Sequence, residues 1–273
     1  MSEKKRVACF FTGGYTELTA MKTFLKKINS KVDFIQLCPV KERTSKLQIK
    51  QRTKHTGAMA KKHSGLTGEA LIKYVTDFVK TERFKNESYD AILIEDDKDE
   101  RFLEELPDGK GKLNLNEWTM FKDSVGKKIH EVLPDIRVIF FFAAPEVEAW
   151  FLADWENSFA KIYKDELKTQ KNDKFNVVFR KYINENILTK RYRKNIEEYG
   201  YFDGEYRKIS YEIQKALGAS EVWRSMNVTE PIEIHYSKKL QGSEMLEEIE
   251  PKKVLKYCNQ FFKEGYNALN EYE

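Results

Sequence analysis

Short apolar segments alternate with longer segments of helical periodicity through the first half of this 273-residue chain. A short apolar run bounded by turn residues is typical of a buried strand, whereas apolar residues three and four positions apart are typical of a helix. Alternation of the two favours the α/β class, with a mainly parallel sheet flanked by helices. The predicted strands are 6–11, 32–37, 89–95 and 136–142, and the predicted helices are 16–27, 66–83, 114–133 and 147–163.

The composition changes after about residue 160, where Lys, Asn, Tyr and Glu dominate and strand-like runs are few. Segments 175–182, 209–217 and 251–269 have helical patterns. We therefore predict an α/β domain over 1–157, with a basic insertion at about 40–64 that forms a loop with some helix. A mainly helical region over 158–273 is expected to pack on that domain.

Composition and the N-terminal sequence argue against several classes of protein. No segment approaches the roughly 20 apolar residues that a membrane span requires. The N-terminal residues 1–6 lack the apolar core and cleavage site of a signal peptide. The three cysteines, Cys9, Cys38 and Cys258, are far apart and form no CxxC or Cys/His zinc spacing. These features predict a cytoplasmic protein with reduced, buried thiols and no role at a membrane.

Two groups of acidic residues directly follow predicted strands. The first is the run Glu95-Asp96-Asp97-Lys98-Asp99-Glu100, and the second contains Glu146 and Glu148. In a parallel α/β sheet the carboxyl ends of the strands form the ligand-binding edge. Like charges gathered there repel each other unless a cation joins them, and carboxylate oxygens are the ligands that Mg²⁺ prefers. The pattern predicts a site for Mg²⁺ or Mn²⁺.

Each acidic group also has a plainer interpretation. Glu95, Asp97 and Asp99 share one face of an extended segment and suit a metal, but they also suit a solvated loop. Glu146 and Glu148 fall in the first turn of a predicted helix, where the helix dipole favours acids without any metal. Similarly, Thr12-Gly13-Gly14 between a strand and a helix permits close approach to a ligand, although the pattern alone favours ordinary turn and cap chemistry.

Basic residues are concentrated in two segments. Eight Lys or Arg residues and one acid lie between Lys41 and Lys62, and a second cluster spans 190–194. Such runs either neutralise phosphates of a nucleic acid or form a solvated surface, and the sequence does not separate the two. The predicted nucleic-acid contacts are Arg43, Lys46, Lys50, Arg52, Lys54, Lys190, Arg191 and Arg193, with Lys238 as a further cation near a reacting phosphate.

Taken in order, these motifs resemble a Toprim domain, the metal-binding fold of topoisomerases, primases and OLD-type nucleases. Within that superfamily the chain most resembles the bacterial family termed domain of unknown function 4276. The segments that carry the resemblance span nearly the whole chain, and the Glu146 segment is the most specific of them: Thr12-Gly13-Gly14-Tyr15-Thr16-Glu17, Glu95-Asp96-Asp97, Glu146-Val147-Glu148-Ala149-Trp150-Phe151-Leu152-Ala153-Asp154, Tyr236-Ser237-Lys238, Gly242, Cys258 and Phe261.

The resemblance implies a divalent-metal-dependent nuclease that acts on DNA or RNA, with a role in defence against phage or mobile elements and with an ATPase partner. The implied catalytic residues are Glu17, Glu95, Asp97 and Glu148, and the implied metal ligands are Glu17, Glu95, Asp97, Asp99, Glu146 and Glu148. One departure matters: Thr12 stands where Toprim domains place a Glu at the end of the first strand. A Thr is no general base, so either Glu17 takes that role or the domain is a silent binding subunit of a larger assembly.

Overall fold

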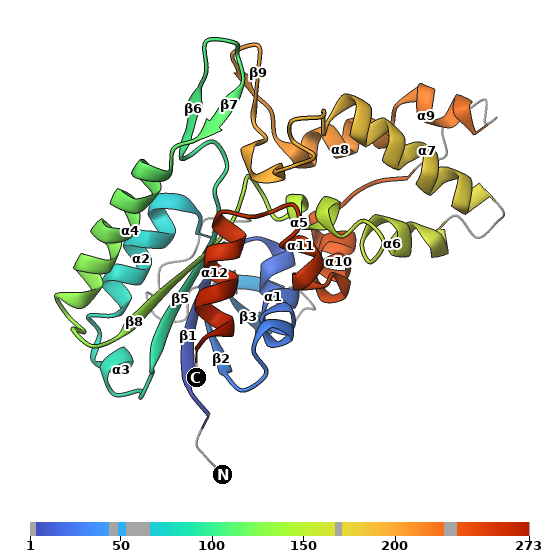
Figure 1. Ribbon diagram of the computed structural model, residues 1–273. Helices are drawn as coiled ribbons and strands as arrows, with labels where there is room; N and C mark the ends of the chain where they lie inside the picture. Colours follow the sequence, from blue (N-terminus) through green and yellow to red (C-terminus); the bar gives the residue numbers. More distant parts are fainter. Residues whose placement is uncertain (1–3, 44–48, 53–65, 167–170, 227–233, 273) are drawn as a thin grey trace. The chain divides into compact units, whose positions relative to one another are not determined.

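The computed structural model describes residues 4–43, 49–52, 66–166, 171–226 and 234–272 (Figure 1). Its central feature is a four-stranded parallel sheet in the order β2-β1-β5-β8. The strands are β1 (Arg6–Phe11), β2 (Asp33–Cys38), β5 (Ala91–Asp97) and β8 (Arg137–Ala143). The predicted α/β class, with a parallel sheet flanked by helices and a mainly helical C-terminal part, is confirmed.

Helices cover both faces of this sheet. Successive residues of a strand point to opposite faces, and most residues of β1, β5 and β8 are apolar, so both faces must be buried. On one face lie α2 (Gly68–Phe78) and α4 (Leu115–His130), and on the other lie α1 (Tyr15–Ile28) and the C-terminal α12 (Phe261–Asn270). The ring of Phe10 contacts α2 through Phe78, with 5.8 Å between centroids. The ring of Phe141 contacts Phe24 of α1, and a Cβ at Gly265 of α12 would overlap the same ring.

The chain divides into two compact units, neither of which is a single stretch of sequence. The first comprises 1–97, 114–142 and 263–273, and the second comprises 98–113 and 143–262. Segments 98–113 and 143–157 of the predicted α/β domain lie in the second unit, and residues 263–273 lie in the first. Composition shows where the character of the chain changes but not where the chain crosses between folding units.

The second unit is mainly helical, with two small hairpins. An aromatic cluster forms part of its core, in which Phe175 stacks on Phe179 and on Trp223. Its elements are β6 (Leu103–Glu105), β7 (Gly111–Leu113), α5 (Glu148–Ala153), α6 (Phe159–Glu166), α7 (Lys171–Asn186), η1 (Ile196–Glu198), β9 (Tyr201–Phe202), β10 (Glu205–Tyr206), α8 (Ile209–Leu217), α9 (Ser220–Ser225), η2 (Lys238–Gly242), α10 (Ser243–Glu248) and α11 (Pro251–Val254).

Four predicted elements differ from those observed, and one of them is helix 251–269, which is divided into α11 and α12. The described parts of the basic insertion form an antiparallel hairpin of β3 (Val40–Arg43) and β4 (Ile49–Arg52), and not the predicted loop with some helix. The predicted helix 147–163 is two helices, interrupted where Asp154 leaves helical dihedral angles. The predicted helix 66–83 ends at Phe78 and is followed by the short α3 (Glu82–Lys85).

No helix within the described ranges is both long enough and apolar enough to cross a membrane.

Candidate functional site

The ends of β1 and β5 lie side by side at the point where the strand order of the sheet reverses. From β1 the chain passes to β2 on one side, and it later enters β5 on the other side of β1. The two strands are parallel with Phe11 opposite Glu95, and the Thr12 N–H donates to the Glu95 carbonyl at 2.9 Å. In open α/β sheets the crevice at such a reversal is the usual ligand site.

Strand β5 continues through the acidic residues instead of ending before them. Because side chains alternate along a strand, Glu95 and Asp97 share a face, and Asp96 lies on the other. Asp96 Oδ2 accepts the Gly68 N–H at 2.9 Å and thereby satisfies a backbone donor at the start of α2. Asp96 therefore has a structural role, which leaves Glu95 and Asp97 as the acids on the opposite face.

Glu17 reaches the same region from the first turn of α1, and its side chain is only 2% exposed. Gly14 is the N-cap residue of this helix, three positions before Glu17. A Cβ at position 14 would overlap Glu17 Oε2. The second glycine of the Gly-Gly loop therefore makes room for the Glu17 carboxylate.

Glu95 is fully buried and electrostatically frustrated. Its Oε2 accepts the Thr12 N–H at 3.1 Å, whereas its Oε1 is buried without a hydrogen-bond partner among the described residues. Burial raises the pKa of Glu95 well above its usual value, and repulsion from Glu17, Asp97 and Asp96 raises it further. Within the described ranges, the hydroxyl of Thr12 is likewise buried without a hydrogen-bond partner. Unsatisfied buried oxygens at the end of a strand are costly and therefore mark a site where a ligand is expected.

The chemistry of these donors fits a hard divalent cation, because Mg²⁺ and Mn²⁺ select carboxylate and hydroxyl oxygens. However, no three His, Cys, Asp or Glu side chains within the described ranges are placed so that they could hold a metal ion together. The donors are therefore of the right kind but not preassembled, and side-chain rotation would have to bring them together.

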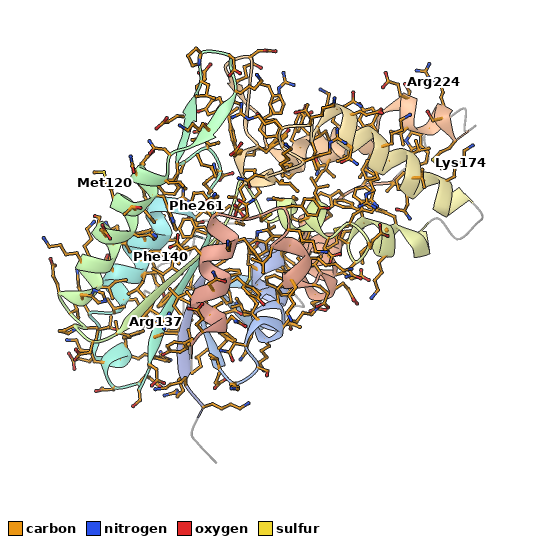
Figure 2. The ribbon with its side chains drawn as sticks, viewed as in Figure 1. Met120, Arg137, Phe140, Lys174, Arg224 and Phe261 are labelled. Carbon is orange, nitrogen blue, oxygen red and sulfur yellow. The ribbon has the colours of Figure 1, made fainter. Side chains whose placement is uncertain are left out.

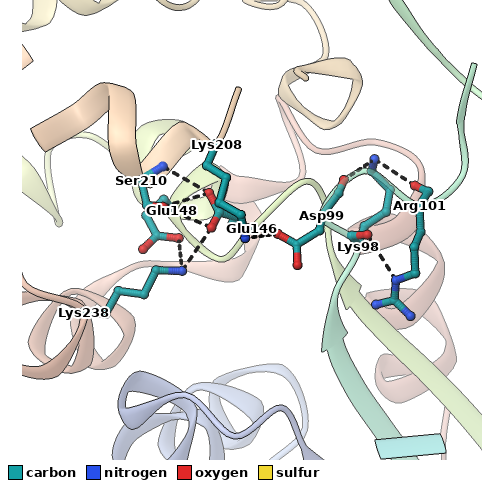
Figure 3. A network of polar contacts seen from close by, with 8 residues as sticks. All are labelled: Lys98, Asp99, Arg101, Glu146, Glu148, Lys208, Ser210 and Lys238. Carbon is teal, nitrogen blue, oxygen red and sulfur yellow. Dashed lines mark hydrogen bonds and ion pairs between the residues drawn. The ribbon is translucent and has the colours of Figure 1, made fainter. Parts of the chain in front are cut away.

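The second acidic group lies in the other compact unit and has protein partners, although the buried Glu148 Oε2 accepts no hydrogen bond from the described residues and meets only the Lys238 ammonium (Figure 3). Glu146 accepts the Ser210 N–H at 3.1 Å and the Ser210 hydroxyl at 3.0 Å, at the N-terminus of α8. Glu148 Oε1 accepts the Tyr236 hydroxyl at 2.7 Å. The ammonium of Lys238 lies 3.2 Å from both Glu146 and Glu148. The cation expected to join these acids is thus supplied by the chain itself.

Lys238 consequently has a different environment from the one predicted. The sequence suggested a contact to nucleic acid, whereas the structure places its Nζ between two buried carboxylates, with the side chain 40% exposed. Burial raises the pKa of Glu148, and Lys238 opposes that rise. Tyr236 and Lys238 thus join Glu146 and Glu148, which the resemblance had named separately.

Two further acids of the second unit are also paired. Asp99, a predicted metal ligand, accepts a hydrogen bond from Lys208 at 2.9 Å (Figure 3). Asp154 Oδ2 accepts the Glu250 N–H at 2.8 Å at the start of α11, and its Oδ1 lies 3.3 Å from the ammonium of Lys253. Each of these carboxylates is therefore paired with a lysine, and Asp154 also accepts a backbone N–H at the start of α11.

Two buried ionisable residues, Lys98 and Glu197, were not predicted from the sequence. Lys98 is fully buried and donates to the carbonyls of Asp99 at 2.8 Å and Arg101 at 3.0 Å, and burial lowers its pKa to about 7. Burial likewise raises the pKa of Glu197 to about 7, although Glu197 accepts the N–H groups of Gln260 and Phe262. Lys98 sits in an acidic run and Glu197 in a polar one, so neither position carries an apolar signal of burial.

The predicted nucleic-acid contacts belong to both compact units. Arg191 donates to the Gly111 carbonyl at 2.6 Å and lies 3.5 Å from Glu198, so it ties two segments of the second unit together. Lys190 and Arg193 are exposed. Arg43 lies in β3, Lys50 and Arg52 lie in β4, and Lys46 and Lys54 lie outside the described residues.

The fold and the acids at the reversal of strand order define an α/β protein with a candidate ligand site at the carboxyl edge of a parallel sheet. Comparison with known families assigns residues 14–219 to the domain of unknown function DUF4276, and the chain belongs to this family. The matched range contains both acidic groups but ends before Tyr236 and Lys238. No curated protein and no solved structure matches the chain.

Proposed function

We propose that this protein is a Toprim-type, divalent-metal-dependent nuclease whose site is formed by Glu17, Glu95 and Asp97. One observation carries the proposal: the buried Glu95 Oε1 has no hydrogen-bond partner in the part of the chain that the structure describes, and it lies among other acids at the reversal of strand order. A fold keeps an arrangement that costs stability where function requires it. A cation would relieve both the repulsion and the unsatisfied oxygen.

Each residue has a defined role in this proposal. Glu95 and Asp97 share one face of β5 and would hold Mg²⁺ or Mn²⁺, which supplies a polarised water and neutralises charge on the phosphodiester. Thr12 offers a neutral hydroxyl in place of the carboxylate found in Toprim domains. Glu17, held in position by the space over Gly14, is then the acid that takes the proton from the attacking water.

Glu146 and Glu148 are left out of the proposed metal set. Their oxygens are occupied by Ser210, Tyr236 and Lys238, which makes them a structural network of the second unit. The wider context follows from the resemblance: a cytoplasmic enzyme that acts on DNA or RNA in defence against phage or mobile elements, with an ATPase partner. The basic residues of the hairpin β3–β4 and of 190–194 would contact the nucleic-acid backbone without reading sequence.

The alternative is a catalytically silent, nucleic-acid-binding or protein-interaction subunit. Thr12 favours this alternative, because one carboxylate of the Toprim set is missing. A second argument for this alternative is that no three His, Cys, Asp or Glu side chains within the described ranges are placed to hold a metal. Binding without cleavage would need only the basic surface.

A cleavage assay separates the two functions. The full chain is incubated with plasmid, single-stranded DNA and RNA, in Mg²⁺, Mn²⁺ or EDTA. Cleavage is expected with a metal and not with EDTA, and Glu95→Gln and Asp97→Asn should each reduce it by about 100-fold or more. Asp77→Asn, which alters an exposed acid of α2, is the matched control and should cleave normally. Unimpaired cleavage by Glu95→Gln would exclude this site, and salt-sensitive binding without any cleavage would favour the silent subunit.

A further inference from the structure

Strand β8 forms one edge of the parallel sheet. It has seven residues, of which Val138-Ile139-Phe140-Phe141-Phe142 form an apolar run. Among the strands that the structure describes, only β5 is its neighbour. A long apolar edge strand presents backbone donors and acceptors on which another chain can pair, and native proteins normally cover such an edge.

A groove runs along this edge between the two helices that flank it. Its volume is about 730 Å³, its floor is residues 138–140, and its walls come from α4 and α12. The walls are fixed to each other, because Trp118 Nε1 of α4 donates to Glu264 Oε2 of α12 at 2.9 Å. Gly126 widens the groove, since a Cβ there would meet no atom within 4 Å. A glycine inside a helix costs about 1 kcal/mol relative to alanine, so its presence beside the groove calls for a steric reason.

The groove-facing side of α4 carries charges of alternating sign. Asp123, Lys127 and Glu131 line the groove at intervals of four residues, and all three are exposed. Met120 lies one turn before Asp123 on the same side and is 72% exposed (Figure 2). An exposed methionine next to an apolar edge strand indicates a surface that is covered when the protein is at work.

We propose that this surface binds a second copy of the chain, with β8 and α4 each antiparallel to their counterparts across a two-fold axis beside Val125. With the axis there, Asp123 of each copy faces Lys127 of the other, and Met120 faces His130. Gly126 lies next to the axis, where the two helices approach most closely. A two-fold interface brings one patch against itself, so it must be complementary to itself.

The pattern of charges is what selects a second copy over an unrelated extended peptide. A peptide that pairs with β8 would place no requirement on α4. By contrast, the spacing of Asp123 and Lys127 produces two identical ion pairs when the helix meets itself in the antiparallel direction. The paired β8 strands would then turn two four-stranded sheets into one continuous sheet and remove both exposed edges.

A charge-exchange experiment tests this dimer on the full chain. Sedimentation equilibrium of the wild-type protein should give twice the monomer mass of 32.3 kDa. Asp123→Lys and Lys127→Glu each place like charges opposite each other, so each should raise the dimer dissociation constant by about tenfold or more. The double variant Asp123→Lys/Lys127→Glu exchanges both signs, and it should restore dimerisation.

Lys128→Glu is the matched control, because it makes the same charge change at the next residue of α4, which does not line the groove. It should dimerise as the wild type does. Far-ultraviolet circular dichroism confirms that each variant is folded. A wild-type protein that stays monomeric at all attainable concentrations would overturn the proposal. Equal dimerisation of the two single variants and the wild type would do the same.

Discussion

The two acidic groups of this protein have the same sequence pattern but opposite electrostatic situations. Glu95 and Glu148 each follow an apolar strand and each is fully buried. Glu148 has a tyrosine hydroxyl at 2.7 Å and an ammonium at 3.2 Å. One oxygen of each carboxylate has no hydrogen bond from the described residues, but that of Glu148 faces the ammonium. Glu95 has one backbone N–H at 3.1 Å, and the charges that act most strongly on it are those of other acids.

The difference lies in distant parts of the chain, not in the acids themselves. The partners that satisfy Glu146 and Glu148 come from Ser210, Tyr236 and Lys238, which are 64, 88 and 92 residues away in sequence from the acids they contact. A local pattern of apolar strand and acids therefore identifies buried carboxylates but does not tell whether the fold has already provided their counter-ion. Glu95, whose buried Oε1 has no hydrogen-bond partner among the described residues, is the acid from which chemistry is expected.

Removing the internal cation should have the largest effect. Lys238→Met leaves Glu146 and Glu148 buried without a positive partner, which should lower the free energy of unfolding by about 3 kcal/mol in a urea titration. Adding Glu148→Gln to this variant should recover about half of the loss, because one of the two charges is gone. Lys239→Met changes an exposed neighbour and should stay within about 0.5 kcal/mol of wild type. If Lys238→Met were as stable as wild type, the ammonium would not be the counter-ion of this pair.

In the first acidic group, neutralising Glu95 should raise the free energy of unfolding, whereas removing Lys238 should lower it. Glu95→Gln keeps the shape and the acceptor for Thr12 while it removes repulsion, so it should raise the free energy of unfolding at pH 8 by about 2 kcal/mol. The pKa of Glu95 is raised in the folded protein, so the folded state binds its proton more tightly than the unfolded state. Glu95 therefore costs stability as the pH rises above the usual glutamate value of about 4.3.

The pH dependence provides the check on that explanation. The stability of Glu95→Gln should fall less steeply with rising pH than that of the wild type, when both are measured by urea unfolding between about pH 4.5 and 8. Glu148 and Glu197 also have raised pKa values, so the difference between the two curves is the informative quantity. Parallel curves would show that Glu95 is not frustrated.

Much of the fold could be predicted from sequence, because its signals are local. The apolar run of β1 and the periodicity of α8 gave boundaries that agree with the structure, Arg6–Phe11 and Ile209–Leu217. The acidic groups were also visible, as was Glu17. The pairing of Glu146 and Glu148 with Lys238 depends on contacts between distant segments. A single sequence contains no signal for those contacts.

A divalent cation should sharpen the comparison by acting on one group only. If Mn²⁺ binds at Glu95, a concentration of about ten times its dissociation constant should stabilise the wild type by about 1.4 kcal/mol. That corresponds to a rise in melting temperature of about 3–5 °C for a chain of this length. Glu95→Gln should abolish the rise, whereas Glu148→Gln should keep it. If Glu148→Gln, and not Glu95→Gln, abolished the rise in melting temperature, we would conclude that the metal binds in the second unit.

The smallest expected effect tests the geometry of Glu17. In Gly14→Ala the new Cβ would overlap the Glu17 carboxylate, so that side chain must move away from the site while its charge and sequence remain. The affinity for Mn²⁺ should then fall by about fivefold, equivalent to about 1 kcal/mol, in isothermal titration calorimetry. Gly218→Ala is the matched control, because a Cβ there makes only ordinary contacts at 3.7 Å and longer. Both variants stiffen the unfolded chain equally. A selective loss of affinity in Gly14→Ala would therefore report the position of Glu17, and equal affinity in the two variants would remove Glu17 from the proposed ligands.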